Sequence, residues 1–173
     1  IIRKQIPDAE IHWAYGFKSG IAKGGMEADG RPWVKDWVEK MKTLIEQTEG
    51  FVNIGRLTQK NVNYLYNDAY VFAYATRFPE IDCISITKAM AAGCKPVVVP
   101  TGALCEKMNI IRETRSVKAN LSNDQKNIDY SIEDGPIFDI WVNNIIKTLQ
   151  DKHNLYNTDE ISNKIYKQYT NEN

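Results

Sequence analysis

The sequence predicts an α/β fold: a three-layer, Rossmann-like parallel sheet with helices on both faces. The first observation is an alternation along the chain, in which short segments rich in β-forming residues are followed by segments whose apolar residues recur at helical spacing. The second is that the strand segments are short and largely apolar, as is typical of strands buried between two layers of helices. We expect the crossovers between parallel strands to be right-handed.

The composition is that of a globular domain. The 173 residues are 43% hydrophobic and 25% charged, which is enough chain for a sizeable core. We interpret residues 1–173 as a single domain, with residues 151–173 as a C-terminal helix or tail. Lys and Arg together number 22, as do Asp and Glu, and this balance argues against nucleic acid as a partner. Cys83, Cys94 and Cys105 lack the spacing of metal ligands, so we expect reduced thiols and a cytoplasmic protein.

The first third of the chain begins with residues typical of a helix end. Residues 10–15, EIHWAY, predict a short strand that is closed by Gly16. Pro32 suits the first turn of a helix, and apolar residues recur at helical spacing from Trp33 to Ile45. This pattern predicts a core-facing stripe that includes the tryptophans.

Strands and helices continue to alternate after this stripe. Thr58 is suited to cap a helix. Residues 115–134 are polar and have no clear periodicity, and a short strand near Val117 is one interpretation. Strands are expected over residues 51–54, 69–75 and 96–99, and helices over residues 58–67, 83–93, 104–111, 137–149 and 157–169.

The carboxyl ends of the strands are where ligands bind in parallel sheets of this kind. Here these ends are Gly16, Gly55 with Arg56, residues 75–80 and residues 100–102. Glycine stands at three of the four places, and the backbone of a glycine can approach a ligand closely.

Residues 74–106 are the segment richest in candidate chemistry. The loop that contains Thr76 and Glu80 leads into a helix that begins near Cys83. The N–H groups of Cys83, Ile84 and Ser85 would point out of the helix start and favour a phosphate. Thr101 and Gly102 would add amides from the adjoining loop. From the residues alone, an ordinary loop with a surface carboxylate is an equally good interpretation.

The segment FPEIDCISITKAMAAGCKPVVVPTGAL, residues 78–104, resembles the donor-binding motif of the retaining group 1 (family 4-like) glycosyltransferases. The family pattern is a Glu, seven residues, a second Glu, and then A-M-A-x-G-x-P-V-V with a glycine-containing loop. Glu80 matches the first Glu, and Gly102 matches the later loop. PDAEIHWAYG and LYNDAYVFAYATRF fit the same domain in order, so the resemblance covers roughly residues 5 to 150. It implies half of a GT-B fold.

The resemblance assigns roles to individual residues. It implies that Glu80 contacts the donor hexose and that the backbone of Cys83 and Ile84, with Ser85 beside it, binds the diphosphate. The family's second Glu, which holds the ribose, is Lys88 here, and an ammonium cannot accept hydrogen bonds. Lys88 would then meet a phosphate or lie on a solvated helix face. The loop at Gly55 and Arg56 would lie beside the nucleotide base.

The resemblance also implies partners and leaves alternatives open. The donor would be a nucleotide sugar such as a UDP- or GDP-sugar, with no metal. The partner would be an N-terminal acceptor-binding domain, through which alone peripheral membrane association would occur. The family's first strand, with a basic pair for the leaving diphosphate, would precede Ile1. A degenerate nucleotide-sugar-binding or interaction module, favoured by Lys88, and a GT-B-type nucleotide-sugar epimerase are the alternatives.

Overall fold

The structure is a computed structural model, and its described residues form two compact units. The N-terminal unit is Pro7–Val62, and the C-terminal unit combines Ile1–Ile6 with the chain from Asn63 onward. The described residues are 1–17, 32–76, 79–99, 101–112, 136–151 and 163.

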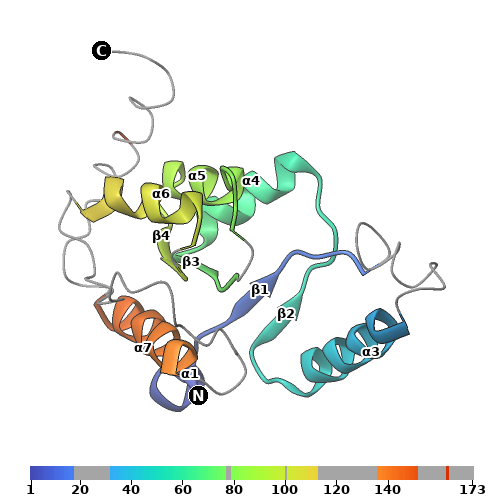
Figure 1. Cartoon of the computed structure of the whole chain (residues 1–173). Helices are drawn as coiled ribbons and strands as arrows, with labels where there is room; N and C mark the ends of the chain where they lie inside the picture. The colour runs from blue at the N-terminus through green and yellow to red at the C-terminus, as the bar shows by residue number, and fades with distance from the viewer. Residues whose placement is uncertain (18–31, 77–78, 100, 113–135, 152–162, 164–173) are drawn as a thin grey trace. The chain divides into compact units, whose positions relative to one another are not determined.

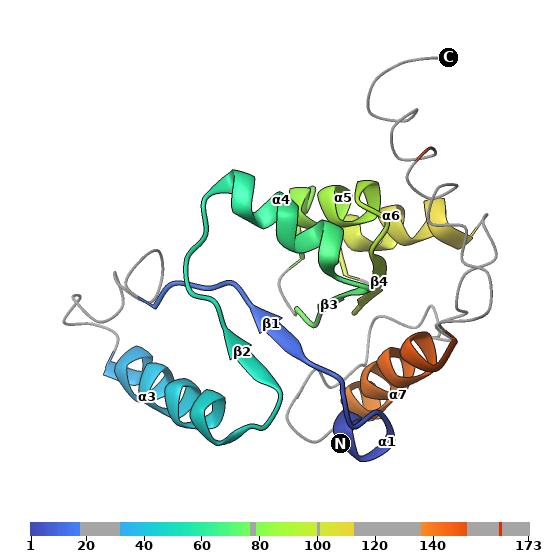
Figure 2. The same cartoon turned by 180° about the vertical axis from the view of Figure 1, so that it is seen from behind.

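The C-terminal unit is built on a parallel pair of strands, β3 (Val71–Tyr74) and β4 (Lys95–Val98). Parallel neighbours need a crossover, and α5 (Ile84–Ala91) supplies it. In Figures 1 and 2, α5 and α6 (Ala103–Arg112) lie on one side of the pair and α7 (Pro136–Gln150) lies on the other. The unit therefore has the local layering of an α/β protein.

The core of this unit joins α5, β4 and the start of α6. Its buried side chains include Ile86 and Met90 of α5, Val98 of β4 and Leu104 of α6. Ile86 and Met90 are four residues apart, so they project from one face of the helix. Half-buried side chains of Phe72, Tyr74, Cys83 and Met108 pack around these four.

The other face of the pair is covered by α7, which packs on both strands. Val142, Ile145 and Ile146 are buried apolar side chains on this helix. The indole Nε1 of Trp141 donates a hydrogen bond of 2.9 Å to the carbonyl oxygen of Val97 in β4. The short helix α1 (Ile2–Gln5) packs against α7.

Helix α5 ends just before Gly93, the glycine that the sequence predicts to terminate it. The Gly93 N–H donates to the Met90 carbonyl at 3.0 Å, and the Cys94 N–H donates to the Ala89 carbonyl at 2.9 Å. Gly93 has a φ of 87°, so this is a Schellman motif with glycine in the left-handed position. The motif turns the chain directly into β4 and buries Cys94.

The thiol of Cys94 gives the fold a dependence on alkaline pH. Burial raises the pKa of Cys94 from 9.0 to about 11, and its Sγ donates to the carbonyls of Tyr66 and Ala69. Because the folded state disfavours the thiolate, this contribution to stability is complete below pH 9.0 and is lost as the pH rises towards 11. Burial also raises the pKa values of Tyr66 and Tyr74, so these two hydroxyls likewise make the folded state less stable as the pH rises.

We therefore expect the melting temperature to fall as the pH is raised from about 9 to about 11. In Cys94→Ala, whose side chain does not titrate, the fall between the same two pH values should be smaller. Differential scanning calorimetry of both proteins across this range measures the two slopes. Equal slopes would show that Cys94 does not carry this dependence.

The N-terminal unit has a second parallel pair, β1 (Ile11–Trp13) with β2 (Phe51–Asn53). Helix α3 (Pro32–Gln47) packs on β2. Val34 and Val38 are buried with Tyr15 and Phe17 against them. Trp13 is at the centre of an aromatic group with Tyr15, Phe17 and Phe51.

Helix α4 (Gln59–Asp68) runs from one unit into the other. The Thr58 hydroxyl accepts a hydrogen bond of 3.3 Å from the Asn61 N–H, which confirms the predicted cap. None of the residues in this helix is fully buried.

Compared with the sequence prediction, the α/β class and the parallel pairing are confirmed. The described strands form two separate pairs, β1–β2 and β3–β4, so one continuous three-layer sheet remains a prediction, as does a single domain over residues 1–173. The strand near Val117 and the helix over residues 157–169 lie outside the described residues. Within the described part of the chain, no helix has the length and apolar character needed to cross a bilayer.

One packing prediction is wrong. Trp33 and Trp37 do not lie in the core, since Trp33 is 60% exposed and Trp37 is also exposed. The neighbouring residues Val34 and Val38 are buried instead. Tryptophan and valine repeat here with the same four-residue spacing, so periodicity alone does not say which of the two faces packs against β2.

Candidate functional site

The candidate site lies in the C-terminal unit, at the carboxyl ends of β3 and β4. Because the two strands are parallel, the loops that follow them emerge at the same edge of the pair. The loop after β3 leads through Glu80 to the start of α5, and the loop after β4 leads through Gly102 to the start of α6. Glu80, Cys83 and Gly102, three of the residues predicted from the sequence, are thus brought together.

The two loops are joined backbone to backbone. The Ala103 N–H donates a hydrogen bond of 2.8 Å to the Glu80 carbonyl oxygen. Gly102 has a φ of 54°, in the left-handed region that favours glycine. A Cβ at position 102 would lie 2.5 Å from the Glu80 carbonyl oxygen and 2.9 Å from the Pro79 carbonyl carbon. The joint therefore requires glycine for both its conformation and its space.

The carboxylate of Glu80 is oriented by Tyr74, the last residue of β3. The Tyr74 hydroxyl donates a hydrogen bond of 2.7 Å to Glu80 Oε1 in a partly buried setting. Burial is the main cause that raises the pKa of Tyr74, and the hydrogen bond to Glu80 adds to it. Tyr74 thus remains a protonated donor at neutral pH, and a residue of the strand fixes the direction of a loop carboxylate.

Helix α5 begins at Cys83 in an unusual conformation. Cys83 is the N-cap and has φ 52° and ψ 68°, the left-handed region that non-glycine residues rarely adopt. Its side chain makes no capping hydrogen bond, while its carbonyl accepts from the Ile86 N–H at 3.2 Å. Ile84 and Ser85 are exposed in the first turn. The predicted helix start at Cys83 is confirmed, and Ile84 and Ser85 in its first turn face solvent while Ile86 is buried.

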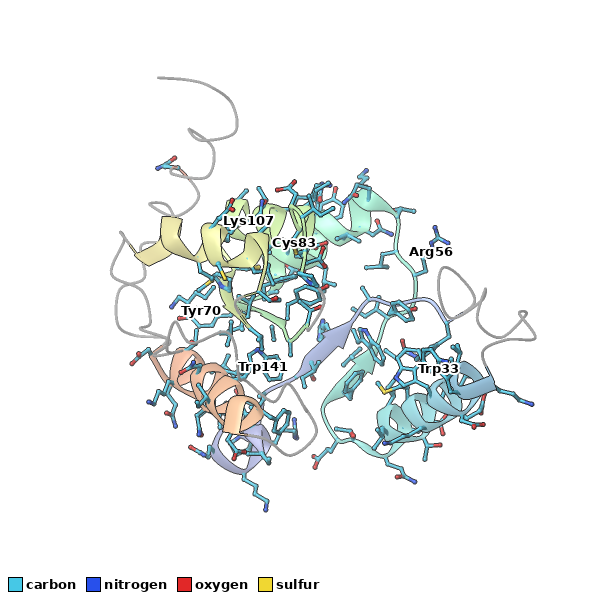
Figure 3. The ribbon with its side chains drawn as sticks, viewed as in Figure 1. Trp33, Arg56, Tyr70, Cys83, Lys107 and Trp141 are labelled. Carbon is cyan, nitrogen blue, oxygen red and sulfur yellow. The ribbon has the colours of Figure 1, made fainter. Side chains whose placement is uncertain are left out.

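A buried lysine ties the start of α5 to α6. Lys107 is only 3% exposed, and its Nζ donates hydrogen bonds of 2.6 Å to Asp82 Oδ1 and 2.6 Å to Thr87 Oγ1. Asp82 precedes the cap residue, and its side chain is 59% exposed. Figure 3 shows Lys107 and Cys83 in the same region of the unit, on the side of α5 and α6.

The charges around Cys83 act on its thiol. Burial is the largest cause that raises the pKa of Cys83, and the carboxylates of Glu80 and Asp82 raise it further. The ammonium of Lys107 and the hydrogen bond with Ile86 lower it. The cap residue therefore lies within the electrostatic influence of all three charged groups.

The remaining predicted residues divide between the two units. Thr76 and Thr101 are half-buried in the same two loops, and Lys88 is half-buried on α5. Gly16, Gly55 and Arg56 lie in the N-terminal unit. In that unit Gly55 has a φ of 76°, its N–H donates to Asn53 Oδ1, and Arg56 is exposed, as Figure 3 also shows.

Sequence reasoning missed Tyr74 and Lys107. In the sequence, Tyr74 is indistinguishable from an ordinary β-forming residue, and no local pattern links it to Glu80. Lys107 carries a weak signal, because it follows the buried Leu104 by three residues and so occupies the inward face of α6. A lysine in such a position needs buried acceptors nearby.

Among the described residues, no group of three or more His, Cys, Asp or Glu side chains could hold a metal ion. Comparisons of the chain with protein-family models, with curated proteins and with solved structures find no match.

Proposed function

We propose that the C-terminal unit binds the donor of a retaining glycosyltransferase, a nucleoside diphosphate sugar. The observation that carries the proposal is the joint between Gly102 and Glu80. It holds a carboxylate and the start of a helix at one edge of a parallel strand pair, which is where ligands of such sheets bind. The resemblance of residues 78–104 to a donor-binding motif supports the same assignment.

Each part of the site has a chemical task in this proposal. The Glu80 carboxylate accepts hydrogen bonds from hexose hydroxyls, with Tyr74 holding its Oε1. The N–H groups in the first turn of α5, at Cys83, Ile84 and Ser85, face the diphosphate, and the helix dipole favours its negative charge. As the bond between sugar and diphosphate breaks, charge develops on the leaving diphosphate, and these groups stabilise it.

The proposal extends to the parts of the enzyme that the family would supply. The fold would be half of a GT-B fold, with a three-layer, Rossmann-like sheet in a cytoplasmic protein. An N-terminal acceptor-binding domain would deliver the attacking hydroxyl, with no metal and no nucleic acid. Thr76, Thr101 and Gly102 would line the donor site.

A second candidate is a nucleotide-sugar-binding module that transfers nothing. Lys88 favours it, because this half-buried ammonium stands where the family has a carboxylate for the ribose. An ammonium only donates hydrogen bonds, whereas ribose hydroxyls are held most firmly by a group that accepts them. Binding of the donor without transfer in the presence of the acceptor domain would favour this candidate.

Calorimetric titration tests the donor site directly. UDP, GDP, UDP-glucose and GDP-mannose are titrated into the protein and into Glu80→Ala. We expect the nucleotides of one of the two bases to bind. In Glu80→Ala, the affinity for the nucleotide sugar should fall by about tenfold, or ~1.4 kcal/mol, because the hexose hydroxyls lose their hydrogen-bond acceptor. The free nucleoside diphosphate should bind the variant about as well as the original protein.

Glu106→Ala is the matched control, since Glu106 is an exposed carboxylate in the first turn of α6. It should leave both affinities unchanged. The proposal is wrong if neither nucleotide binds, or if Glu80→Ala binds the nucleotide sugar as tightly as the original protein.

A further inference from the structure

The ammonium of Lys107 lies close enough to the candidate site to affect its balance of positive and negative charge. Burying a charge is costly unless it is paired and hydrogen-bonded. Lys107 meets this requirement with the Asp82 carboxylate and the Thr87 hydroxyl, each 2.6 Å from its Nζ. Its two partners come from the residue before the α5 cap and from the first half of α5. A cation carried by α6 therefore lies beside the start of α5.

The need for this cation follows from the acidic residues around it. Glu80 and Asp82 place two carboxylates within three residues of the cap, on the loop that leads into α5. A diphosphate that approaches the first turn of α5 would be repelled by both. The Asp82 side chain is 59% exposed, so part of its charge faces solvent even though Oδ1 is bound to Lys107. Lys107 offsets this repulsion.

We propose that Lys107 is a positioning residue of the donor site: it fixes Asp82 against α6 and neutralises it, so that the start of α5 can accept a diphosphate. This inference rests on the proposed function. It adds a residue outside the loop motif and gives the Asp82–Lys107 pair an electrostatic role in binding, beyond that of a tie between two helices.

A charge-balance experiment separates the two roles. Inorganic pyrophosphate, UDP and GDP are titrated into the protein and into Lys107→Met, Asp82→Asn and the double variant that carries both changes. We expect Lys107→Met to lower the affinity for pyrophosphate, and for the nucleotide that binds, at least tenfold. Asp82→Asn should bind both at least as tightly as the original protein, and the double variant should recover most of the affinity lost in Lys107→Met.

A purely structural tie predicts a different pattern. Either single change would then loosen the start of α5, so both would weaken binding, and the double variant would bind no better than Lys107→Met. That pattern overturns the inference. Circular dichroism confirms folding, and the double variant, which lacks both members of the Asp82–Lys107 ion pair, keeps the test valid if a single variant does not fold. Lys147→Met, an exposed lysine on α7, is the control and should change nothing.

The use of two kinds of ligand keeps this inference apart from the proposed function. Pyrophosphate binding that depends on Lys107, without binding of either nucleotide, supports the inference and contradicts the donor site. Nucleotide binding that is the same in Lys107→Met and the original protein overturns the inference and leaves the donor site intact. A protein that binds neither pyrophosphate nor nucleotide contradicts both.

Discussion

Replacing Gly102 with alanine is expected to destabilise the C-terminal unit by about 2–4 kcal/mol and to abolish the proposed binding of a nucleoside diphosphate. The new Cβ would lie 2.5 Å from the Glu80 carbonyl oxygen, and that neighbour is backbone, which cannot rotate away. The left-handed φ of 54° adds a further penalty of about 1 kcal/mol for a residue with a side chain. The two loops must separate, and the Ala103 to Glu80 hydrogen bond is lost with them.

Gly55→Ala is the matched control for this change. Gly55 also has a positive φ, of 76°, but nothing lies within 4 Å of the position that its Cβ would take. Only the conformational penalty of about 1 kcal/mol should remain. Urea unfolding compares the stability of the two variants, and calorimetry with UDP and GDP measures the loss of binding in Gly102→Ala. If Gly102→Ala is no more destabilised than Gly55→Ala, the close approach of the loops is not a feature of the folded protein.

Leu104→Ala is expected to cost about 3 kcal/mol, because it leaves a cavity at the centre of the core between α5 and β4. Leu104 is 0% exposed and packs in the cluster with Ile86, Met90 and Val98. The same substitution at Leu44, which is 46% exposed on α3, should cost less than about 1 kcal/mol. The comparison holds the chemistry of the change constant and varies burial alone.

Hydrogen exchange followed by mass spectrometry assigns this loss to a region. In Leu104→Ala, the amides of β4 and α5 should exchange faster, and those of β2 and α3 should keep their original rates, because they belong to the other unit. Leu44→Ala should leave β4 unaffected. Equal acceleration in the two units would contradict the division of the chain into separately packed cores.

The sequence predicted the local structure well wherever the properties of a single residue determine the local conformation. Gly93 ends α5 because a left-handed C-terminal position favours glycine, and Thr58 caps α4 through its own hydroxyl. Gly102 was predicted as a ligand-facing residue, whereas its observed role is to let two loops touch. The structural reason for a glycine at this position became visible only with the neighbouring loop in place, and a ligand contact at Gly102 stays a prediction.

Features that depend on distant parts of the chain escaped prediction. The hydrogen bond from Tyr74 to Glu80 and the burial of Lys107 arise from loops and helices that meet only after folding. Likewise, the periodicity of α3 identifies a helix, yet it cannot tell whether the tryptophans or the valines are buried. Whether the two strand pairs belong to one sheet is also a question of long-range pairing, which short apolar segments do not answer.

The joint between Gly102 and Glu80 has a consequence for the thermodynamics of recognition. A loop that is ordered only when its ligand arrives loses conformational entropy at that moment, and the observed affinity falls accordingly. Here the Ala103 N–H and the Tyr74 hydroxyl already hold Glu80 at its backbone and at its carboxylate. This part of the entropy is lost when the chain folds, so Glu80 is preorganised before any ligand is bound.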